Sequence, residues 1–218
     1  MDKVMSAEQA VARIRSGDVL LVGGFLQRGS PETLLGALLE RDVKDLTIVS
    51  NDTGTADTKT IQLMEKGMVS HAKATYIGAN RLAGQMLIDD PSSVELVPQG
   101  TLAERIRAAG AGLGGILVEV GLGTVAAENK DTLEVDGKTY ILEKPLFGDV
   151  ALIYATIADK QGNLHMKGAT KNFNCLMPLA ADLVLVEAEK IVEVGELDSE
   201  MIHVPGALVD CICQREED

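Results

Sequence analysis

The stretch DVLLVGGFLQRGSPETLLGALL, residues 18–39, contains the pattern from which the fold can be inferred. Its first part, residues 18–22, reads as a short buried strand, and a glycine-rich loop at residues 23–29 follows. A helix is expected next, with Ser30 as its N-cap and Pro31 at its first position. The apolar stripe of this helix consists of Leu34, Leu35, Leu38 and Leu39. The stretch therefore predicts a strand-turn-helix unit.

Strand-like and helix-like segments alternate along the rest of the chain. Further strands are expected at residues 46–50, 72–77, 94–97, 116–120, 150–157 and 183–186, and further helices after Ser6, at 79–88 and at 101–109. Such alternation is typical of an α/β fold with a mostly parallel, open sheet and helices on both faces. Residues 132–142 predict a β-hairpin around Asp136-Gly137, expected as an antiparallel excursion from the main sheet. Without repeats, low-complexity tracts or linkers, residues 1–218 are predicted to form one domain.

Composition and charge argue against several kinds of function. The 218 residues carry a formal net charge of −13, which disfavours a nucleic-acid surface and an anionic membrane as partners. The three cysteines form no C-x-x-C pair and the three histidines no H-x-x-x-H spacing, so we expect neither disulfides nor a metal site. The charged start Met1-Asp2-Lys3 is unlike a signal peptide, and no apolar stretch is long enough to span a bilayer. These features predict a cytoplasmic protein.

Two turns lie where a parallel α/β sheet binds its ligands, beyond the carboxyl ends of the strands. One is the loop at residues 23–29, and the other begins at Asn51. Glycines in the loop allow backbone N–H groups to face an anion at close range, although a tight strand-to-helix turn without a ligand explains the same pattern. Asn51 and Asp52 are also ordinary turn residues, so both interpretations stay open.

Three further motifs are informative to different degrees. Residues 110–115, GAGLGG, formally satisfy G-x-G-x-x-G, but they follow a helix and precede a strand, which predicts a helix C-cap with close contacts and not a dinucleotide site. Gln99 lies between a strand and a helix, where its amide suits a carboxylate or thioester carbonyl, or is simply a solvated turn residue. Asn172-Phe173-Asn174 is explained by a helix cap and a buried ring.

Taken together, these motifs resemble the alpha subunit of family I CoA-transferases, of the acetate/acetoacetate/butyrate type. The resemblance covers nearly the whole chain, in family order. It rests on VGGF at 22–25 with Gly29 and Pro31, NDT at 51–53, PQGTLAERIR at 98–107, GLGT at 121–124, GNL at 162–164, NFN at 172–174 and VEVGEL at 192–197.

The resemblance implies a fold, an activity and a partner. It implies the CoA-transferase superfamily fold, a hetero-oligomer built from αβ pairs, and transfer of CoA between a short-chain acyl-CoA and a free carboxylate. In the family a beta-subunit glutamate forms an acyl-glutamyl anhydride and then a glutamyl-CoA thioester, which is ping-pong catalysis with CoA as a substrate and no tightly bound cofactor. The nucleophile motif Ser-Glu-Asn-Gly is absent here, since Ser199-Glu200 continues as Met201. The chain is therefore expected to supply half of an active site.

The resemblance also assigns candidate site residues by their position in the family motifs. Gln99 is expected as an auxiliary amide near the attacking glutamate and the acyl group, and Asn51 is expected to line the same pocket. The segment expected to contact CoA comprises Gly23, Gly24, Phe25, Leu26, Gln27, Arg28 and Gly29.

Two departures from the family pattern bear on specificity. The loop has Gln27 and Arg28 where the family usually has small residues, and Arg28 either pairs with a CoA phosphate or is solvated. The run Val118-Glu119-Val120 stands where the family commonly has Thr-Pro-Thr. A carboxylate from Glu119 in the substrate pocket would favour an amino-substituted short acid; otherwise this side chain faces solvent or a partner chain.

Two other functions are compatible with the pattern. Sugar-phosphate isomerases have a related fold, but they need an acid and a base within one chain, and no such pair is placed at the strand ends. A non-catalytic CoA- or acyl-binding regulatory module is the second alternative.

Overall fold

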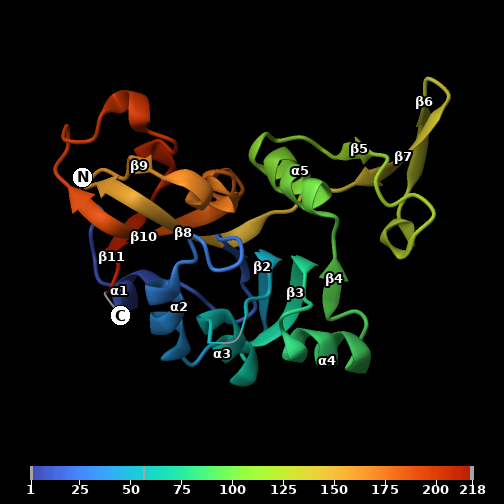
Figure 1. Cartoon of the computed structure of the whole chain (residues 1–218), viewed down its shortest axis with the longest axis horizontal. Coiled ribbons are helices and arrows are strands. Elements are labelled where there is room, and N and C mark those ends of the chain that lie inside the picture. The colour runs from blue at the N-terminus through green and yellow to red at the C-terminus, as the bar shows by residue number, and fades with distance from the viewer. Residues whose placement is uncertain (1, 56, 217–218) are drawn as a thin grey trace.

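The main sheet has eight strands, and all neighbours along its seven-strand path are parallel (Figure 1). The computed structural model describes residues 2–55 and 57–216. In order across the sheet the strands are β11 (Cys211–Gln214), β10 (Ala181–Val192), β8 (Gly148–Asp159), β1 (Val19–Val22), β2 (Leu46–Asp52), β3 (Val69–Tyr76) and β4 (Val94–Leu96). The eighth strand, β9 (Leu164–His165), pairs antiparallel with β8. The mostly parallel sheet predicted from the sequence is confirmed.

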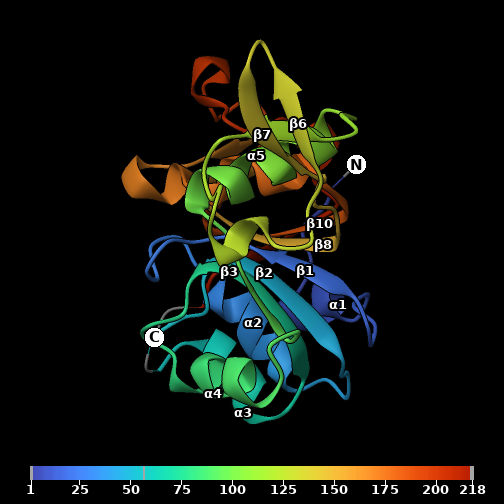
Figure 2. The same ribbon diagram turned by 90° about the vertical axis from the view of Figure 1, so that its right-hand side faces the viewer.

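Helices cover both faces of this sheet (Figures 1 and 2). One face carries α1 (Ala7–Val11), α2 (Glu32–Leu39), α3 (Lys59–Glu65) and α4 (Arg81–Asp89), and the other carries α5 (Gln99–Gly110) with the 3₁₀ turns η2 (Gly168–Lys171), η3 (Phe173–Cys175) and η4 (Met177–Leu179). A separate apolar cluster fills each interface. Within the described residues no helix combines the length and apolar character that a membrane crossing requires. The short turns η1 (Val125–Ala127), η5 (Ser199–Met201) and η6 (Gly206–Leu208) lie elsewhere in the chain.

The predicted hairpin belongs to a second, antiparallel sheet. It consists of β6 (Thr132–Val135) and β7 (Lys138–Glu143), joined by Asp136 and Gly137 with φ of 51° and 76°, as a primed turn requires. β5 (Ile116–Val118), expected in the succession of parallel strands, pairs antiparallel with β7 instead. Residues 113–143, here called the arm, stand away from the main sheet (Figure 1). The excursion is therefore larger than predicted, and the single domain predicted for residues 1–218 stays a prediction.

The start of α2 also differs from the prediction. Pro31 is the N-cap with φ −83° and ψ 68°, the helix begins at Glu32, and the Ser30 hydroxyl donates to the Glu32 carboxylate at 2.6 Å. The N–H groups of Thr33 and Leu34, which an N-cap side chain would accept, donate instead to the carboxylate of Glu187 at 2.7 and 3.4 Å. A residue from β10 thus replaces the local cap that the sequence predicts.

Other boundaries follow from local hydrogen bonds. Ser6 and Gln9 form a capping box at α1, which confirms the expected cap. The helix α5 begins at Gln99, two residues before its predicted start, and α3 and β11 were not predicted. At the end of α5, Gly112 has φ 68° and the N–H of Leu113 donates to the carbonyl of Ala108 at 2.9 Å. This is a Schellman motif, and the C-cap predicted for the GAGLGG segment is confirmed.

A buried arginine joins α5, the main sheet and the arm. Arg105 is 7% exposed, and its Nη1 lies 2.7 Å from the carboxylate of Glu95 on β4. Its Nε donates to the carbonyl of Lys144 at 3.0 Å and lies 3.7 Å from the carboxylate of Glu143 at the end of β7. The backbone carbonyl of Arg105 accepts the N–H of Leu146 at 3.0 Å. The chain leaving the arm is therefore bonded to the middle of α5.

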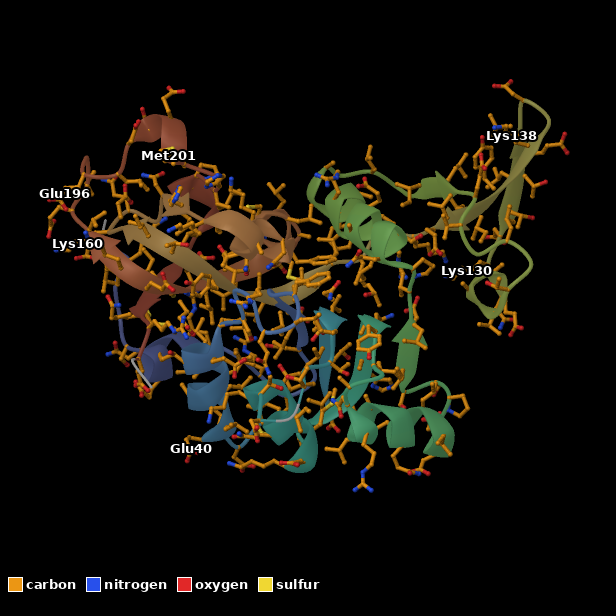
Figure 3. The ribbon with its side chains drawn as sticks, in the orientation of Figure 1. Glu40, Lys130, Lys138, Lys160, Glu196 and Met201 are labelled. Carbon is orange, nitrogen blue, oxygen red and sulfur yellow. The ribbon has the colours of Figure 1, made fainter. Side chains whose placement is uncertain are left out.

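Two lysines complete this buried network. Lys73 on β3 binds the second oxygen of Glu95 at 2.7 Å, and Lys130 in the arm binds Glu143 at 2.6 Å (Figure 3). Burial alone would raise the pKa of Glu95, but the hydrogen bond from Lys73 and the charge of Arg105 outweigh it and lower the pKa to about 2. Glu95 is thus charged throughout the neutral range, and Arg105 is its partner on α5.

Removing Arg105 should be more costly than removing its exposed neighbour on the same helix. Arg105→Ala takes one cationic partner from Glu95 and from Glu143, which keep Lys73 and Lys130, and leaves the carbonyl of Lys144 without its donor. We therefore expect the free energy of unfolding to fall by roughly 1–3 kcal/mol. Arg107, whose side chain is 57% exposed and pairs with Glu104 in the preceding turn, is the matched control. Arg107→Ala should cost less than about 1 kcal/mol. Equal losses for the two variants in urea unfolding would contradict the assignment of the buried network.

Candidate active site

Three segments meet beyond the carboxyl ends of β1 and β2. Gln99 begins α5, Asn51 ends the buried part of β2, and the loop at residues 23–29 follows β1. The Gln99 side-chain amide donates to Asn51 Oδ1 at 2.5 Å, the Asn51 amide donates to Asp52 at 2.9 Å, and Asp52 accepts the N–H of Leu26 at 2.9 Å. Gln99, Asn51 and the loop, predicted separately from the sequence, are therefore joined by one chain of hydrogen bonds.

Within this series of hydrogen bonds, the exposed amide of Gln99 is the group that a ligand can reach. Asn51 is only 3% exposed, and its backbone carbonyl also accepts the Thr75 hydroxyl at 2.8 Å. Gln99 is exposed, and among the described residues its side-chain carbonyl has no donor. A buried asparagine thus orients an exposed glutamine whose remaining donor and acceptor face outward.

The loop is a strained, tightly bonded turn. Phe25 and Arg28 exchange backbone hydrogen bonds at 3.2 and 2.9 Å, and the two residues between them, Leu26 and Gln27, have φ of 44° and 67°. Side chains other than glycine disfavour this left-handed region by roughly 1–2 kcal/mol per residue. Phe25 and Leu26 are 39% and 48% exposed, so the turn presents apolar side chains to solvent. Such strain persists only where surrounding contacts enforce it.

Two asparagines at η3, on the face of the sheet that carries α5, hold the loop in this strained conformation. Asn172 accepts the N–H of Gly24 at 3.2 Å and donates to the carbonyl of Arg28 at 2.8 Å. Asn174, fully buried, donates to the carbonyl of Gly29 at 2.9 Å. A Cβ atom at Gly23 would lie 1.8 Å from Asn174 Oδ1, so only glycine fits there.

The Asn172-Phe173-Asn174 motif therefore does more than the sequence indicated. The predicted cap and buried ring are confirmed, since Asn172 accepts the N–H of Asn174 at 3.3 Å and Phe173 is 7% exposed. The hydrogen bonds to the loop were missed. They join residues about 150 positions apart, and no local pattern signals them.

The loop N–H groups are mostly used within the chain. The N–H of Gly23 donates to the carbonyl of Leu152 at 2.9 Å. Four other N–H groups donate to the acceptors named above, those of Gly24, Phe25, Leu26 and Arg28. In the described chain only the N–H groups of Gln27 and Gly29 lack an acceptor. The start of α2 is likewise taken by Glu187. An anion at this loop would therefore meet few free backbone donors.

A narrow cleft lies beneath the loop. Its walls come from the ends of β1 and β2 and from the start of α3, and six of its side chains carry oxygen. The lining residues are Val22, Gly23, Gly24, Phe25, Gln27, Ser30, Ser50, Asp52, Gly54, Thr58 and Thr60. The Gln27 side-chain amide closes one end by donating to the hydroxyl of Thr55.

The other two candidates lie outside this cluster. Arg28 is exposed, with no ion pair from its side chain to the described residues. Glu119 follows β5 in the arm, is exposed, and lies 3.7 Å from Lys138 near the arm's tip (Figure 3). The described residues therefore bring Gln99, Asn51 and the loop together, but not Glu119, whose place in a substrate pocket stays a prediction.

A known protein family matches this chain along nearly its whole length. The model of the family described as coenzyme A transferase matches residues 4–215. The chain belongs to the coenzyme A transferase family. This CoA-transferase chain is 46% identical to the acetate CoA-transferase subunit alpha of Escherichia coli K12, over 99% of this chain and 98% of the relative. It is 43% identical to the acetoacetyl-CoA:acetate/butyrate CoA transferase alpha subunit of Clostridium acetobutylicum, over 96% of each.

Solved structures show the same fold. Glutaconate coenzyme A-transferase of Acidaminococcus fermentans superposes with a TM-score of 0.84 at 20% identity, over 97% of this chain and 75% of that chain. The acyl-CoA transferase apoenzyme of Escherichia coli O157:H7 gives 0.87 at 24% identity, over 98% of this chain but only 47% of that chain. Membership of an enzyme family leaves the isomerase and regulatory-module alternatives without support.

The buried carboxyl of Glu187 controls how α2 follows the loop of the CoA-transferase chain. Glu187 is fully buried, and its second oxygen lies 3.7 Å from Arg215 Nε without a hydrogen bond in the described chain. Burial raises the pKa of Glu187 to about 7, although the N–H groups of Thr33 and Leu34 and the charge of Arg215 act to lower it. This carboxyl therefore changes its protonation near neutral pH.

Glu187 should make stability fall as the pH rises through the weakly acidic range. Because its pKa rises from 4.5 to about 7 on folding, the folded protein binds more protons than the unfolded chain between these values. The resulting loss is at most roughly 3 kcal/mol at 1.36 kcal/mol per pKa unit. Glu187→Gln, which keeps an acceptor for the start of α2, should remove this part of the pH dependence.

The matched control is Glu189→Gln on the same strand, which removes an exposed carboxylate 3.5 Å from Arg215. Free energies of unfolding measured from about pH 5 to pH 8 should show the wild-type slope in this control. A Glu187→Gln profile parallel to that of the wild type would refute the role of the buried carboxyl.

Proposed function

We propose that this chain is the alpha subunit of a CoA-transferase that moves CoA between a short-chain acyl-CoA and a free carboxylate. The proposal requires a beta subunit that carries the nucleophilic glutamate. The observation that carries the proposal is the series of hydrogen bonds from Gln99 to the loop. This series leaves the Gln99 amide exposed to a ligand, but its one carboxylate, that of Asp52, is already hydrogen-bonded within the site. Acetate, acetoacetate, butyrate and amino-substituted short acids are the proposed carboxylates, and CoA is a substrate.

The one carboxylate in the cluster is unsuited to be the nucleophile. Asp52 accepts three N–H donors, from Leu26, from the Asn51 side chain and from Gly54 at 3.2 Å. A carboxylate bonded in this way is stabilised and a weaker nucleophile. The Ser-Glu-Asn-Gly motif is also missing from the sequence. Both observations support a half-site that is completed by a second subunit.

The relatives support the same partner and substrate class. The two alpha subunits compared above are named for acetate, acetoacetyl-CoA and butyrate, and the name alpha presupposes a second subunit. High identity over the full length of both chains makes the same class of substrate the best proposal for this chain. A cytoplasmic location stays a prediction.

In the proposed reaction the beta-subunit glutamate attacks the acyl-CoA thioester and the CoA thiolate leaves. The thiolate then attacks the glutamyl carbonyl of the anhydride and releases the first carboxylate, which leaves a glutamyl-CoA thioester. The second carboxylate reverses these steps. Gln99 would donate to oxygen atoms that gain negative charge, Asn51 would hold Gln99 in place, and residues 23–29 would contact CoA through Phe25 and Leu26.

The first experiment measures acyl-CoA:acetate CoA transfer by this chain alone, by its beta subunit alone and by the mixture. Only the mixture should be active. Within the mixture, Gln99→Ala should lower kcat by about 10²-fold, because it removes a donor at the developing charge. Gln85→Ala, at an exposed glutamine of α4, should leave kcat unchanged. Activity from this chain alone would contradict the half-site, and full activity of Gln99→Ala would remove Gln99 from it.

Substrate choice tests the proposed role of Glu119. If its carboxylate lines the pocket in the assembled enzyme, Glu119→Thr should lower the turnover of 3-aminobutyrate relative to butyrate, since an ammonium group loses its partner. The comparison is made with saturating beta subunit. An unchanged ratio would exclude Glu119 from the pocket and leave it as a charged group of the arm, paired with Lys138.

A further inference from the structure

One apolar face of the arm is left uncovered by the part of the chain that the structure describes. In the antiparallel ladders Leu133 lies opposite Tyr140 and Leu117 opposite Leu142, and directly opposed residues share a face of the sheet. Val135, two residues beyond Leu133, lies on the same face. We call this surface, made of Leu117, Leu133, Val135, Tyr140 and Leu142, the arm face. Leu117, Leu133 and Val135 are each between 41% and 43% exposed.

The opposite face of the arm is covered around Ile141. Ile141, on that face, is fully buried, and a Cβ atom at Gly121 would lie 3.6 Å from its side chain. The chain after β5 therefore folds over one side of the sheet and leaves the other open. All four residues of β6 are exposed, and among the described strands β6 pairs with β7 alone. A three-stranded sheet normally gains its stability by covering its apolar face.

Exposed apolar side chains are concentrated in this part of the chain. Of the large hydrophobic residues that are exposed in the described structure, Leu117, Leu133 and Val135 lie on the arm face, whereas Val120, Leu122 and Val125 belong to the segment after β5. Isolated exposed apolar residues are ordinary, but a contiguous group rimmed by charges marks an interaction surface. The ion pair of Glu119 and Lys138 lies at the rim, because both follow the strand register onto the arm face. This is the composition of a protein interface, apolar at its centre and polar at its edge.

The arm is attached to the helix that carries Gln99. Arg105 lies 3.7 Å from the Glu143 carboxylate and donates to the carbonyl of Lys144, where the arm returns to the main sheet, and α5 begins six residues earlier at Gln99. A protein seated on the arm face is therefore held in a fixed relation to the exposed amide of Gln99.

We propose that the arm face is the surface on which the beta subunit docks and so brings its glutamate to Gln99. This inference rests on the proposed function, because it takes the missing nucleophile as its occupant. Charge decides against a second copy of this chain. The arm has six acidic and two basic side chains, a balance of −4, and the whole chain carries −13, so two copies would repel. A partner with a basic rim around an apolar centre is the complementary one.

The test uses a beta subunit that carries Ser-Glu-Asn-Gly and reconstitutes transfer with the wild-type chain. The double variant Leu133→Asp, Val135→Asp places two carboxylates at the apolar centre of the arm face. Its dissociation constant for the beta subunit, measured by calorimetry, should therefore be at least about tenfold higher. At saturating beta subunit its kcat should approach the wild-type value. Ile88→Asp is the matched control, since Ile88 is 75% exposed on α4, and it should bind as the wild type does.

The outcomes separate this inference from the proposed function. A wild-type mixture without transfer activity refutes the proposed function itself. An active wild-type mixture with equal affinity of the double variant refutes only the arm face. Loss of self-association in the double variant, with beta-subunit affinity unchanged, overturns the inference in favour of a second copy. If the double variant unfolds, Leu133→Thr with Val135→Thr keeps good strand formers on β6 and gives the same decision.

Discussion

The position of the loop after β1 depends on one fully buried side chain, Asn174. Its amide donates to the carbonyl of Gly29, its carbonyl accepts the N–H of Tyr154 on β8 at 3.0 Å, and its Oδ1 occupies the space where a side chain at residue 23 would lie. A buried amide with an unmade hydrogen bond costs roughly 1–3 kcal/mol, so the loop and the sheet must satisfy it together. That requirement pulls the loop against the sheet and makes glycine obligatory at residue 23.

The strain in the loop follows from the same constraint. With both ends held by Asn172 and Asn174, the intervening residues can close only as a primed turn, and Leu26 and Gln27 accept left-handed conformations. Asp52 then fixes the tip from the β2 side, because it binds the N–H of Leu26. Its carboxylate is consumed in shaping the site. Because the carboxylate of Asp52 is held by hydrogen bonds that shape the loop, the nucleophile has to come from another subunit.

Local patterns predicted the parts of the fold that local physics determines. The Asp136-Gly137 turn, the strand at residues 18–22 and the cap at Ser6 each depend on a few consecutive residues, and each is confirmed. The start of α2 was wrong because its cap comes from Glu187, more than 150 residues away.

The candidate site shows the same division between local and distant information. Gln99 and Asn51 were candidates through their places at strand ends and the family resemblance, but the hydrogen bond between them was not predictable. Only the folded sheet brings these two residues together, 48 positions apart. The strand predicted at residues 116–120 was placed in the wrong sheet, because a short apolar run contains no pattern that identifies the strand it pairs with.

Arg105 links the candidate site to the arm. One guanidinium group binds β4 through Glu95 and the arm through Glu143 and Lys144, while its own helix begins with Gln99. A displacement of the arm would have to separate the Arg105 guanidinium from the buried Glu143 carboxylate and from the carbonyl of Lys144, which is more costly than breaking an exposed pair. The helix and the arm therefore move as one body. A partner that binds the arm positions itself relative to Gln99 at the same time, so assembly of the subunits and alignment of the reacting groups become a single event.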